Sequence, residues 1–393
     1  MFLISFLKRT FRYGRLYIDG ILKEKVEESD MSLYLMAKDL PVLEIGQGEC
    51  RILNRELLPF SLRKEKVALE DFYGTWMNSR ALQLSRSNSK MILNSMRVSQ
   101  TNAYKICQTC HGASLSDMYW FKEKEEEKEL VWSEVSLFRN DISRGMASTA
   151  LVGDVLRERG RIHTPELTTQ GVAAKAWVRK GQELYLYKIG KKELAASAVL
   201  DTLGFAHVPY QKVEGEELDR VVTARRKERI RALDERVVKC RLIASEEHSM
   251  VSFEDFQIYC QENGKNVFEE TLALDRLHYL EMQIADYILN NIDRHGANWG
   301  FFMDNETGRL EKLYPLMDHD QAFSDVEGMR SQTTEQNLDL ETAALLAQTE
   351  LHADLGRILQ MAQPEGISEK QWAQVQRRAA ELDERCRIYE SEL

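Results

Sequence analysis

The sequence predicts an α+β protein in which a β-rich part is followed by a largely helical part. Apolar residues alternate or cluster in short runs up to about residue 245, and they recur at helical spacing beyond it. The chain has 393 residues, of which 43% are hydrophobic and 30% charged, and this composition is typical of globular proteins. The length predicts two or three domains.

The first part of the chain combines a small β-rich unit with helices. Short apolar runs favour strands within 30–66, and apolar residues spaced among polar ones favour interrupted helices over 69–96. The charged run 122–129 is typical of a solvated loop or helix face. Residues 140–159 predict a helix that Gly160 ends.

A β-hairpin and a helix follow. Alternating residues over 174–179 and 183–189, separated by a tight turn at Gly181, predict two antiparallel strands. Apolar residues over 192–203 share one helical face, and Gly204 is expected to end that helix. Further strands are expected at 208–212 and 236–245.

Helices dominate the remainder. Apolar residues recur at helical spacing in three stretches, 272–289, 339–362 and 367–391. Between them, the apolar runs 301–303 and 313–317 predict a buried hairpin. The expected domains are an N-terminal mixed region at 1–160, a β-rich lobe at 161–245 and a helical lobe at 246–393.

Charge and cysteine content indicate the surroundings in which the chain works. A net charge of -10 argues against a protein that coats nucleic acid, so direct nucleic-acid binding is not expected. The basic run 225–231 is interpreted as a solvated excursion. We expect a cytoplasmic protein without a membrane partner, since the apolar start 1–7 lacks a cleavage site and the six cysteines are scattered.

Three polar side chains stand out around the expected hairpin. Asp293 and Asn298 lie in the loop before it, and Asp318 follows it, so the hairpin would return Asp318 to that loop. Phosphoryl transfer needs one carboxylate to orient the attacking hydroxyl, and a carboxylate with an amide oxygen to hold Mg²⁺. Asp293 suits the first role, and Asn298 and Asp318 suit the second.

The hairpin and helix upstream offer a basic partner for the same chemistry. Lys188 closes the second strand, where it could meet the α- and β-phosphates of a nucleotide, and Glu193 at the start of the next helix could orient it. His295 is expected to support the loop by hydrogen bonding. Singly, each residue is more often a surface or turn residue, and only the ordered set favours a site.

These loops resemble a known kinase family. Asn291-Ile-Asp-Arg-His-Gly-Ala-Asn298, followed by Tyr314-Pro-Leu-Met-Asp318, is similar to the catalytic and metal-binding loops of HipA-type serine/threonine kinases. The Asp-Arg-His core also resembles that of phosphoinositide kinases, which share the broader fold. The resemblance covers about 160–335 and implies a two-lobed, protein-kinase-like α+β fold behind an additional N-terminal region.

By that resemblance, Asp293 is the catalytic base, Lys188 contacts ATP, and Asn298 with Asp318 binds Mg²⁺. Val238-Lys239-Cys240 is the interlobe hinge beside the nucleotide. No G-x-G-x-x-G is present, and the segment before the first hairpin strand offers only Gly171 for a close backbone approach to phosphate, with Thr168 or Thr169 as the residue that becomes phosphorylated. The choice of Asp318 over Asp320 depends on the resemblance alone.

The resemblance implies an ATP- and Mg²⁺-dependent kinase with a protein substrate, autophosphorylation and a toxin-type role with an antitoxin partner. Two alternatives stay open: a kinase of a small molecule or lipid headgroup, and an inactive binding module that keeps the kinase shape. The sequence keeps Lys188, Asp293, Asn298 and Asp318 together. This argues against the inactive module, because a binding domain needs neither metal ligands nor a base.

A further motif lies outside that set. Cys107-Gln-Thr-Cys-His111 has the spacing of covalent haem attachment and of half a zinc site. Haem attachment would require export, and a second Cys or His pair for zinc is not evident nearby. We therefore interpret these residues as structural.

Overall fold

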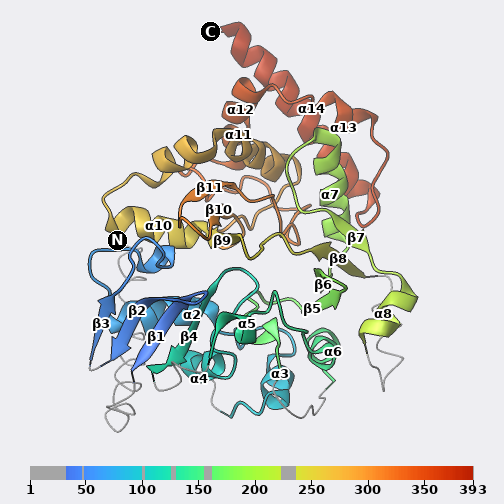
Figure 1. Cartoon of the computed structure of the whole chain (residues 1–393). Coiled ribbons are helices and arrows are strands. Elements are labelled where there is room, and N and C mark those ends of the chain that lie inside the picture. The colour runs from blue at the N-terminus through green and yellow to red at the C-terminus, as the bar shows by residue number, and fades with distance from the viewer. Residues whose placement is uncertain are drawn as a thin grey trace.

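The computed structural model describes residues 32–46, 48–99, 102–124, 130–154, 162–222 and 236–392. Figure 1 shows an N-terminal region with one sheet at the bottom, a second small sheet on the right and a helical lobe at the top. The expected α+β arrangement, with a β-rich lobe and a helical lobe behind an additional N-terminal region, is confirmed. The expectations for 1–7 and 225–231 lie outside the described residues.

The N-terminal sheet is antiparallel and has the order β3-β2-β1-β4. Its strands are β1 (Leu33–Ala37), β2 (Leu40–Gly46), β3 (Glu49–Ile52) and β4 (Tyr119–Glu123). The β-rich unit expected over 30–66 is confirmed. The charged run 122–129 begins differently from the expectation, because Lys122 is buried in β4 opposite Tyr34 and donates to Leu130 O at 3.3 Å.

Short helices make up the rest of the N-terminal region, and the interruptions expected over 69–96 are confirmed. The helix expected over 140–159 is shorter than predicted. It begins after Ser143, whose Oγ accepts from Met146 N, and ends at Val152, because Gly153 takes the left-handed conformation with φ 76°. Gly160 lies outside the described residues. The helices are η1 (Phe60–Leu62), η2 (Asp71–Trp76), α2 (Met77–Arg80), α3 (Ser89–Ser95), α4 (Ala103–Gln108), α5 (Trp132–Val135) and α6 (Arg144–Val152).

The second sheet has the order β5-β6-β8-β7 and carries the expected hairpin. Its register places Lys175 opposite Lys188, and Gly204, with φ 76°, ends the following helix as predicted. Lys188 therefore lies at the end of the sheet from which that helix begins. The elements are η4 (Pro165–Leu167), β5 (Lys175–Lys180), β6 (Glu183–Ile189), α7 (Lys192–Leu203), β7 (Tyr210–Lys212), α8 (Gly215–Val221) and β8 (Val237–Arg241).

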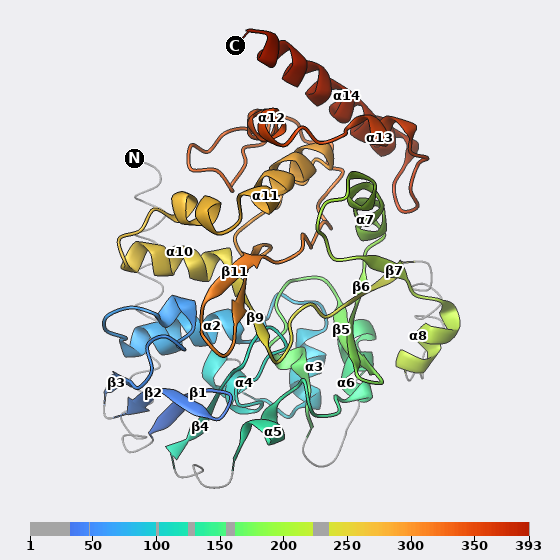
Figure 2. The ribbon, with the colours of Figure 1, turned by 45° about the horizontal axis from the view of Figure 1, so that its top comes forward.

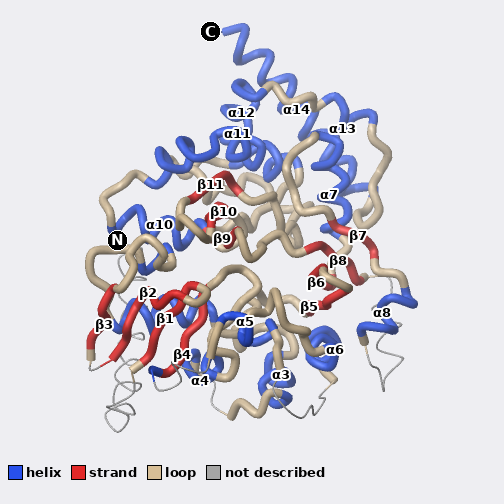
Figure 3. The backbone as a smooth tube through the Cα atoms, in the orientation of Figure 1, coloured by secondary structure: helices blue, strands red, loops and turns tan. Residues whose placement is uncertain are grey.

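The C-terminal part is mainly helical, as Figure 3 shows, with one sheet of order β11-β10-β9. A hairpin forms as expected, with β10 covering the run 301–303, but its second strand, β11, lies before the expected run 313–317 and ends at Leu313. The long helix starts earlier than predicted, at Val267, and its backbone leaves the helical region at Asp275. The elements are β9 (His248–Ser252), α10 (Phe253–Glu262), α11 (Val267–Ile288), β10 (Gly300–Asp304), β11 (Leu310–Leu313), α12 (Leu340–Leu351), α13 (Gly356–Gln360) and α14 (Glu369–Glu392).

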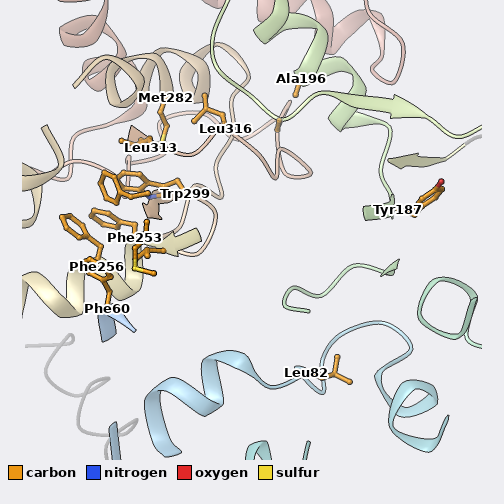
Figure 4. Packing of buried hydrophobic residues seen from close by; sticks show 14 of the residues in the cluster. Phe60, Leu82, Tyr187, Ala196, Phe253, Phe256, Met282, Trp299, Leu313 and Leu316 are labelled. Carbon is orange, nitrogen blue, oxygen red and sulfur yellow. The ribbon is translucent and has the colours of Figure 1, made fainter. Parts of the chain in front are cut away.

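An aromatic core fixes the hairpin beneath the polar loop. Figure 4 shows Phe253, Phe256 and Trp299 close together in this core. The rings of Phe253 and Trp299 stack with centroids 4.0 Å apart, and Phe256 meets Phe301 edge-on with centroids 4.7 Å apart. Gly300 is required between them, because a Cβ there would lie 2.0 Å from Val251 O. This packing holds the backbone that directly follows Asn298.

The N-terminal region packs on both lobes, as the turned view in Figure 2 illustrates. Met250 N in β9 donates to Ser116 O at 2.7 Å, and an Arg63 nitrogen donates to Gly308 O at 2.7 Å. Buried residues from all three regions form one apolar cluster. Among the described residues, no helix combines the length and apolarity that a bilayer crossing requires.

Candidate active site

Lys188 lies at the centre of a buried charge cluster. Its Nζ donates to Glu193 Oε1 and, at 2.8 Å, to Asp318 Oδ1. Burial favours the neutral amine, but Glu193 and Asp318 outweigh it, so the pKa of Lys188 lies above its usual range. The structure thus brings together three residues that are 130 positions apart at most.

Asp318 remains ionised in this cluster. Burial raises its pKa, but Lys188 and then Lys175 outweigh that effect, so the pKa of Asp318 lies below its usual range. For the neighbouring Asp320, burial and the charge of Asp318 raise the pKa. The surrounding charges therefore favour Asp318 over Asp320 as the carboxylate that stays ionised.

Arg294 joins the two loops that carry the predicted polar residues. It is 3% exposed, and its Nη1 donates to Asn298 O at 3.2 Å and to Met317 O at 2.7 Å. Its other nitrogens bind both oxygens of Asp286, a buried carboxylate on α11. One guanidinium thus fixes the backbone at Asn298 and the backbone next to Asp318, since its planar fork holds several acceptors at once.

The loop between Asn291 and Asn298 closes on itself. Asn298 Nδ2 donates to Asp293 O at 3.1 Å, and His295 N donates to the same oxygen at 2.9 Å. His295 Nδ1 accepts from Ala297 N at 3.3 Å. These bonds leave the Asp293 carboxylate and Asn298 Oδ1 without a hydrogen bond from any described residue, so both oxygens can act on a ligand.

Backbone strain accompanies these positions. Asp318 has φ 59° and Asn290 has φ 44°, both in the left-handed region that most residues avoid. Each costs on the order of 1 kcal/mol, which the surrounding contacts must offset. Next to Asp318, His319 N donates to both oxygens of Glu193 at 3.1 and 3.2 Å, so the backbone after Asp318 is tied to α7.

A cavity of about 350 Å³ opens beside this cluster, and all three regions of the chain line it. Ala297 and Met317, the chain neighbours of Asn298 and Asp318, form part of its wall. The lobes contribute apolar side chains, among them Trp177, Leu186 and Met250. A mostly apolar hollow with some polar groups in its wall is the form of a small-molecule site.

The connection between the lobes borders this cavity. The expected hinge Val238–Cys240 lies inside β8, and the connecting backbone follows it at 242–247, so the hinge lies a few residues later than predicted. Cys240 lines the cavity. Lys239 instead donates to both oxygens of Glu217 on α8 at 2.8 Å, so it is not part of the cavity wall.

Residues 164–175 form a strap along another wall of the cavity. Thr168 Oγ1 donates to Ala113 O at 2.8 Å, and Thr169 Oγ1 donates to Pro165 O at 2.7 Å. Glu166, 1% exposed, pairs with the buried Arg86 of the N-terminal region. Thr168 and Thr169 thus line the cavity while their hydroxyl groups serve the strap.

Two functional candidates were missed from the sequence. Arg294 was taken only as part of a motif, and Lys175 only as a strand residue, because long charged side chains in loops and at strand ends are mostly exposed. Lys175 is 9% exposed and lines the cavity. The Asp-Arg-His order was the signal that could have identified Arg294; for Lys175 the sequence carries no such signal.

The cysteine motif has a structural environment. Cys107 is buried, its thiol faces Met77 O, and burial raises the pKa of Cys110 to about 11. Within the described residues, neither cysteine belongs to a cluster of metal-ligating side chains. The structural interpretation of this motif is retained.

Comparisons with known proteins give one relative by sequence. The chain is 28% identical over 97 residues to the serine/threonine-protein kinase CtkA of Helicobacter pylori. The match spans 21% of this chain and 30% of the relative, so the chain matches less than a third of that kinase's length. No protein-family model matches the chain. The resemblance to HipA-type kinases predicted from the two loops is confirmed at this distant level.

Two solved structures are similar in part. The crystal structure of CtkA from Helicobacter pylori covers 56% of this chain and 91% of its own, with 14% identity and a TM-score of 0.40. A complex of HipA, HipB and operator DNA from Shewanella oneidensis contains a chain that covers 90% of this chain and 96% of its own. Its identity is 13% and its TM-score is 0.49.

Proposed function

We propose that the chain is an ATP-dependent phosphotransferase of the HipA-like serine/threonine protein kinase type. The observation that carries this proposal is the cluster in which Lys188 Nζ binds Glu193 and lies 2.8 Å from Asp318. A lysine held by a helix carboxylate beside a metal-binding aspartate is the arrangement that positions nucleotide phosphates in kinases. The base and ribose of ATP would occupy the 350 Å³ cavity. Cys240 and the connection between the lobes form part of the wall of this cavity.

Asp293 is proposed as the base. Its carboxylate would accept the proton of the substrate hydroxyl while that oxygen bonds to the terminal phosphorus and the bond to the leaving ADP breaks. Arg294 holds Asp293's loop through its bond to Asn298 O. His295 is a loop residue in this scheme, since its ring accepts a bond from Ala297 N.

The residues present fit a magnesium ion. Asn298 uses its amide nitrogen on Asp293 O, which leaves its amide oxygen available, and Asp318 offers the carboxylate oxygen that Lys188 does not hold. An amide oxygen with an ionised carboxylate suits Mg²⁺, which prefers oxygen ligands and keeps several waters. When bound, such an ion would offset the negative charge of the phosphates.

A protein substrate and autophosphorylation on the strap belong to the same proposal. Thr169 is only partly buried, whereas Thr168 is 5% exposed, so we favour Thr169 as the acceptor. Either hydroxyl would have to leave its carbonyl partner first. The limits 161–245 and 246–393 are proposed for the two lobes. A toxin-type role with an antitoxin partner stays a prediction from the family resemblance.

The test is transfer of labelled phosphate from ATP to proteins of a cell extract, compared with a pool of small molecules. Label on protein from the unchanged chain, lost in Asp293→Asn, would support the proposal. The matched control is Asp325→Asn, an exposed acid of the helical lobe, which should transfer at the original rate. Label that appears only on small molecules would favour a small-molecule kinase, and undiminished transfer by Asp293→Asn would refute the base assignment.

A further inference from the structure

Three side chains of different chemistry meet where α12 and α14 end, at the outer end of the helical lobe in Figure 1. His352 directly follows α12, and Cys386 and Glu390 lie one turn apart on α14. His352 Nδ1 lies 3.3 Å from Glu390 Oε1, and the thiol of Cys386 donates to the same oxygen at 3.3 Å. The imidazole nitrogen, the sulfur and the carboxylate oxygen all lie within 4.8 Å of one another. We call these three residues the terminal cluster.

The spacing of the three atoms matches the ligands of one zinc ion. A tetrahedral Zn²⁺ holds nitrogen and oxygen ligands at about 2.0–2.2 Å and sulfur at about 2.3 Å, so neighbouring ligand atoms lie roughly 3.3–3.6 Å apart. The two distances of 3.3 Å in the terminal cluster fall within that range. Imidazole, thiolate and carboxylate are also the ligand types that zinc takes in proteins. Small side-chain shifts would therefore close the terminal cluster around such an ion.

Cys386 gives the terminal cluster a ligand that an ordinary surface ion pair lacks. Its side chain is 4% exposed and ends the buried face of α14 that Val375, Ala379 and Leu382 form. A thiolate in this position would be costly without a cation beside it, because burial penalises the charge. A bound Zn²⁺ supplies that cation, and the thiol proton passes to the solvent as the bond from sulfur to zinc forms.

His352 occupies a position that glycine commonly takes. It has φ 50° and ψ 44°, in the left-handed region, and its N–H ends α12 by donating to Gln348 O at 2.9 Å. A glycine would make the same bond without the strain that a Cβ causes there. The chain thus bears backbone strain at the position from which the imidazole ring reaches Glu390.

One other group of possible metal ligands occurs among the described residues, and it lacks these features. His248, Asp304 and Glu311 gather on the sheet formed by β9, β10 and β11. This group has no thiol, and Asp304 Oδ1 already accepts from Thr307 N at 2.7 Å and from Thr307 Oγ1 at 2.6 Å. We interpret it as a turn with a surface ion pair, so it provides a control.

We propose that the terminal cluster binds one zinc ion through His352 Nδ1, Cys386 Sγ and Glu390 Oε1. The side chains of His352 and Glu390 are 64% and 40% exposed, so the fourth position of the ion faces the solvent and takes a water. The ion ties the end of α12 to the last turns of α14, where the side chains of 387–392 are all exposed. The proposal is independent of the kinase proposal, since it uses none of the same residues.

The first test adds Co²⁺ to the reduced full chain after treatment with a chelator. Co²⁺ accepts the ligands of zinc but binds them less tightly, and a thiolate bound to it produces a charge-transfer absorption band. We expect one equivalent of Co²⁺ to produce this band and Zn²⁺ to abolish it. Cys386→Ser should prevent the band, whereas Cys50→Ser, at a half-buried thiol of β3, and His248→Gln should retain it. An unchanged band in Cys386→Ser, or no band in the unchanged chain, would overturn the proposal.

The second test measures the affinity for Zn²⁺ by titration calorimetry. The unchanged chain should bind one ion with a Kd of about 1 μM or below. Glu390→Gln should weaken binding by about tenfold or more, because a ligand oxygen loses its charge. Glu392→Gln alters an exposed acid at the end of the same helix and should bind as tightly as the unchanged chain. Equal affinities in the two glutamine variants would remove Glu390 from the site and overturn the proposal.

The third test compares thermal melts with and without Zn²⁺. Saturating Zn²⁺ should raise the melting temperature of the unchanged chain by about 2 °C or more, because the ion binds the folded state. His352→Gly relieves the left-handed strain, so it should melt higher than the unchanged chain without zinc and gain nothing from the ion. Asn337→Gly relieves the same kind of strain, at φ 50°, and should keep the response to zinc. A full response to zinc in His352→Gly would overturn the proposal.

Discussion

Two buried arginines hold the two loops that border the cavity, and they do so differently. Arg294 binds Asp286 of its own lobe and the carbonyls of Asn298 and Met317. Arg86 reaches from the N-terminal region to Glu166 and to carbonyls of the strap and β5, including Lys175 O at 2.6 Å. One arginine thus fixes a loop within a lobe, and the other fixes a loop to a different region.

The carboxylate partners sharpen this difference. For Glu166, burial outweighs Arg86, so its pKa lies above the usual range. For Arg294, burial is outweighed by Asp286, and its own pKa is raised. Arg294 is therefore held in its charged form, whereas the pair that holds the strap contains a carboxylate, Glu166, that can take up a proton. Releasing the strap from Arg86 should therefore cost less free energy than releasing the other loop from Arg294.

The largest effect is expected from Arg294→Met. It leaves Asp286 buried without its cation, which should reduce the free energy of unfolding by about 3–5 kcal/mol and abolish phosphate transfer. Urea denaturation measures the stability. Arg276→Met removes an exposed pair with Glu350 and should cost about 1 kcal/mol or less. Equal midpoints for the two variants would show that Arg294 is not a structural clamp.

Arg86→Met should cost less, about 2–3 kcal/mol, because Glu166 can become neutral. Adding Glu166→Gln to it should then cost little more. The variant should also become less stable as pH rises: above the ordinary carboxyl pKa the unfolded chain has lost the Glu166 proton while the folded chain retains it. Urea midpoints across a pH series measure this. A variant more stable at high pH would contradict the assignment.

Lys188→Met should reverse the way in which the stability contributed by Glu193 depends on pH. Burial raises the pKa of Glu193, but Lys188 outweighs it, and the net shift is downward. The stabilisation from Glu193 is thus present above the ordinary carboxyl pKa and is lost as pH falls through the folded pKa. Without Lys188, the pKa of Glu193 should rise above its ordinary value. The free energy of unfolding should then decrease by about 1–2 kcal/mol as the pH rises from about 4 to about 7. Thermal melts across that range decide the sign.

The smallest effect is expected from Thr168→Val, which removes one bond from the strap to the N-terminal region. Losing the hydrogen bond to Ala113 O should cost about 1 kcal/mol. Thr349→Val removes a comparable bond on an exposed helix face and provides the reference. If the two variants had the same melting temperature, the Thr168 hydrogen bond would not contribute to fixing the strap.

Local patterns were enough to predict the elements that carry the site. The hairpin at 175–189, the helix ended by Gly204 and the hairpin after Trp299 each depend on residues close in sequence. The pairing of β4 with β1 and the end of α6 at Gly153 were missed. Alternation shows which face of a strand is buried, but it does not identify the distant strand that pairs with it.

The site could be predicted only as a set of residue types. Lys188, Glu193 and Asp318 are in contact, and Asp293 and Asn298 share one loop. The burial of Arg294 and of Lys175 could not be predicted from the sequence, because burial of a charged side chain depends on partners brought by other segments. Lys239 shows the reverse case, since its partner Glu217 lies away from the cavity.

The hydrogen bond from Met250 N to Ser116 O places the N-terminal region in the wall of the 350 Å³ cavity. Trp76, Ser79 and Asp117 thereby become part of the surface that any compound in the cavity would touch. Under the proposed function, a competitive inhibitor would gain selectivity over other kinases from side chains that belong to neither lobe. Resistance mutations could then arise there without changing the residues proposed to act on phosphate.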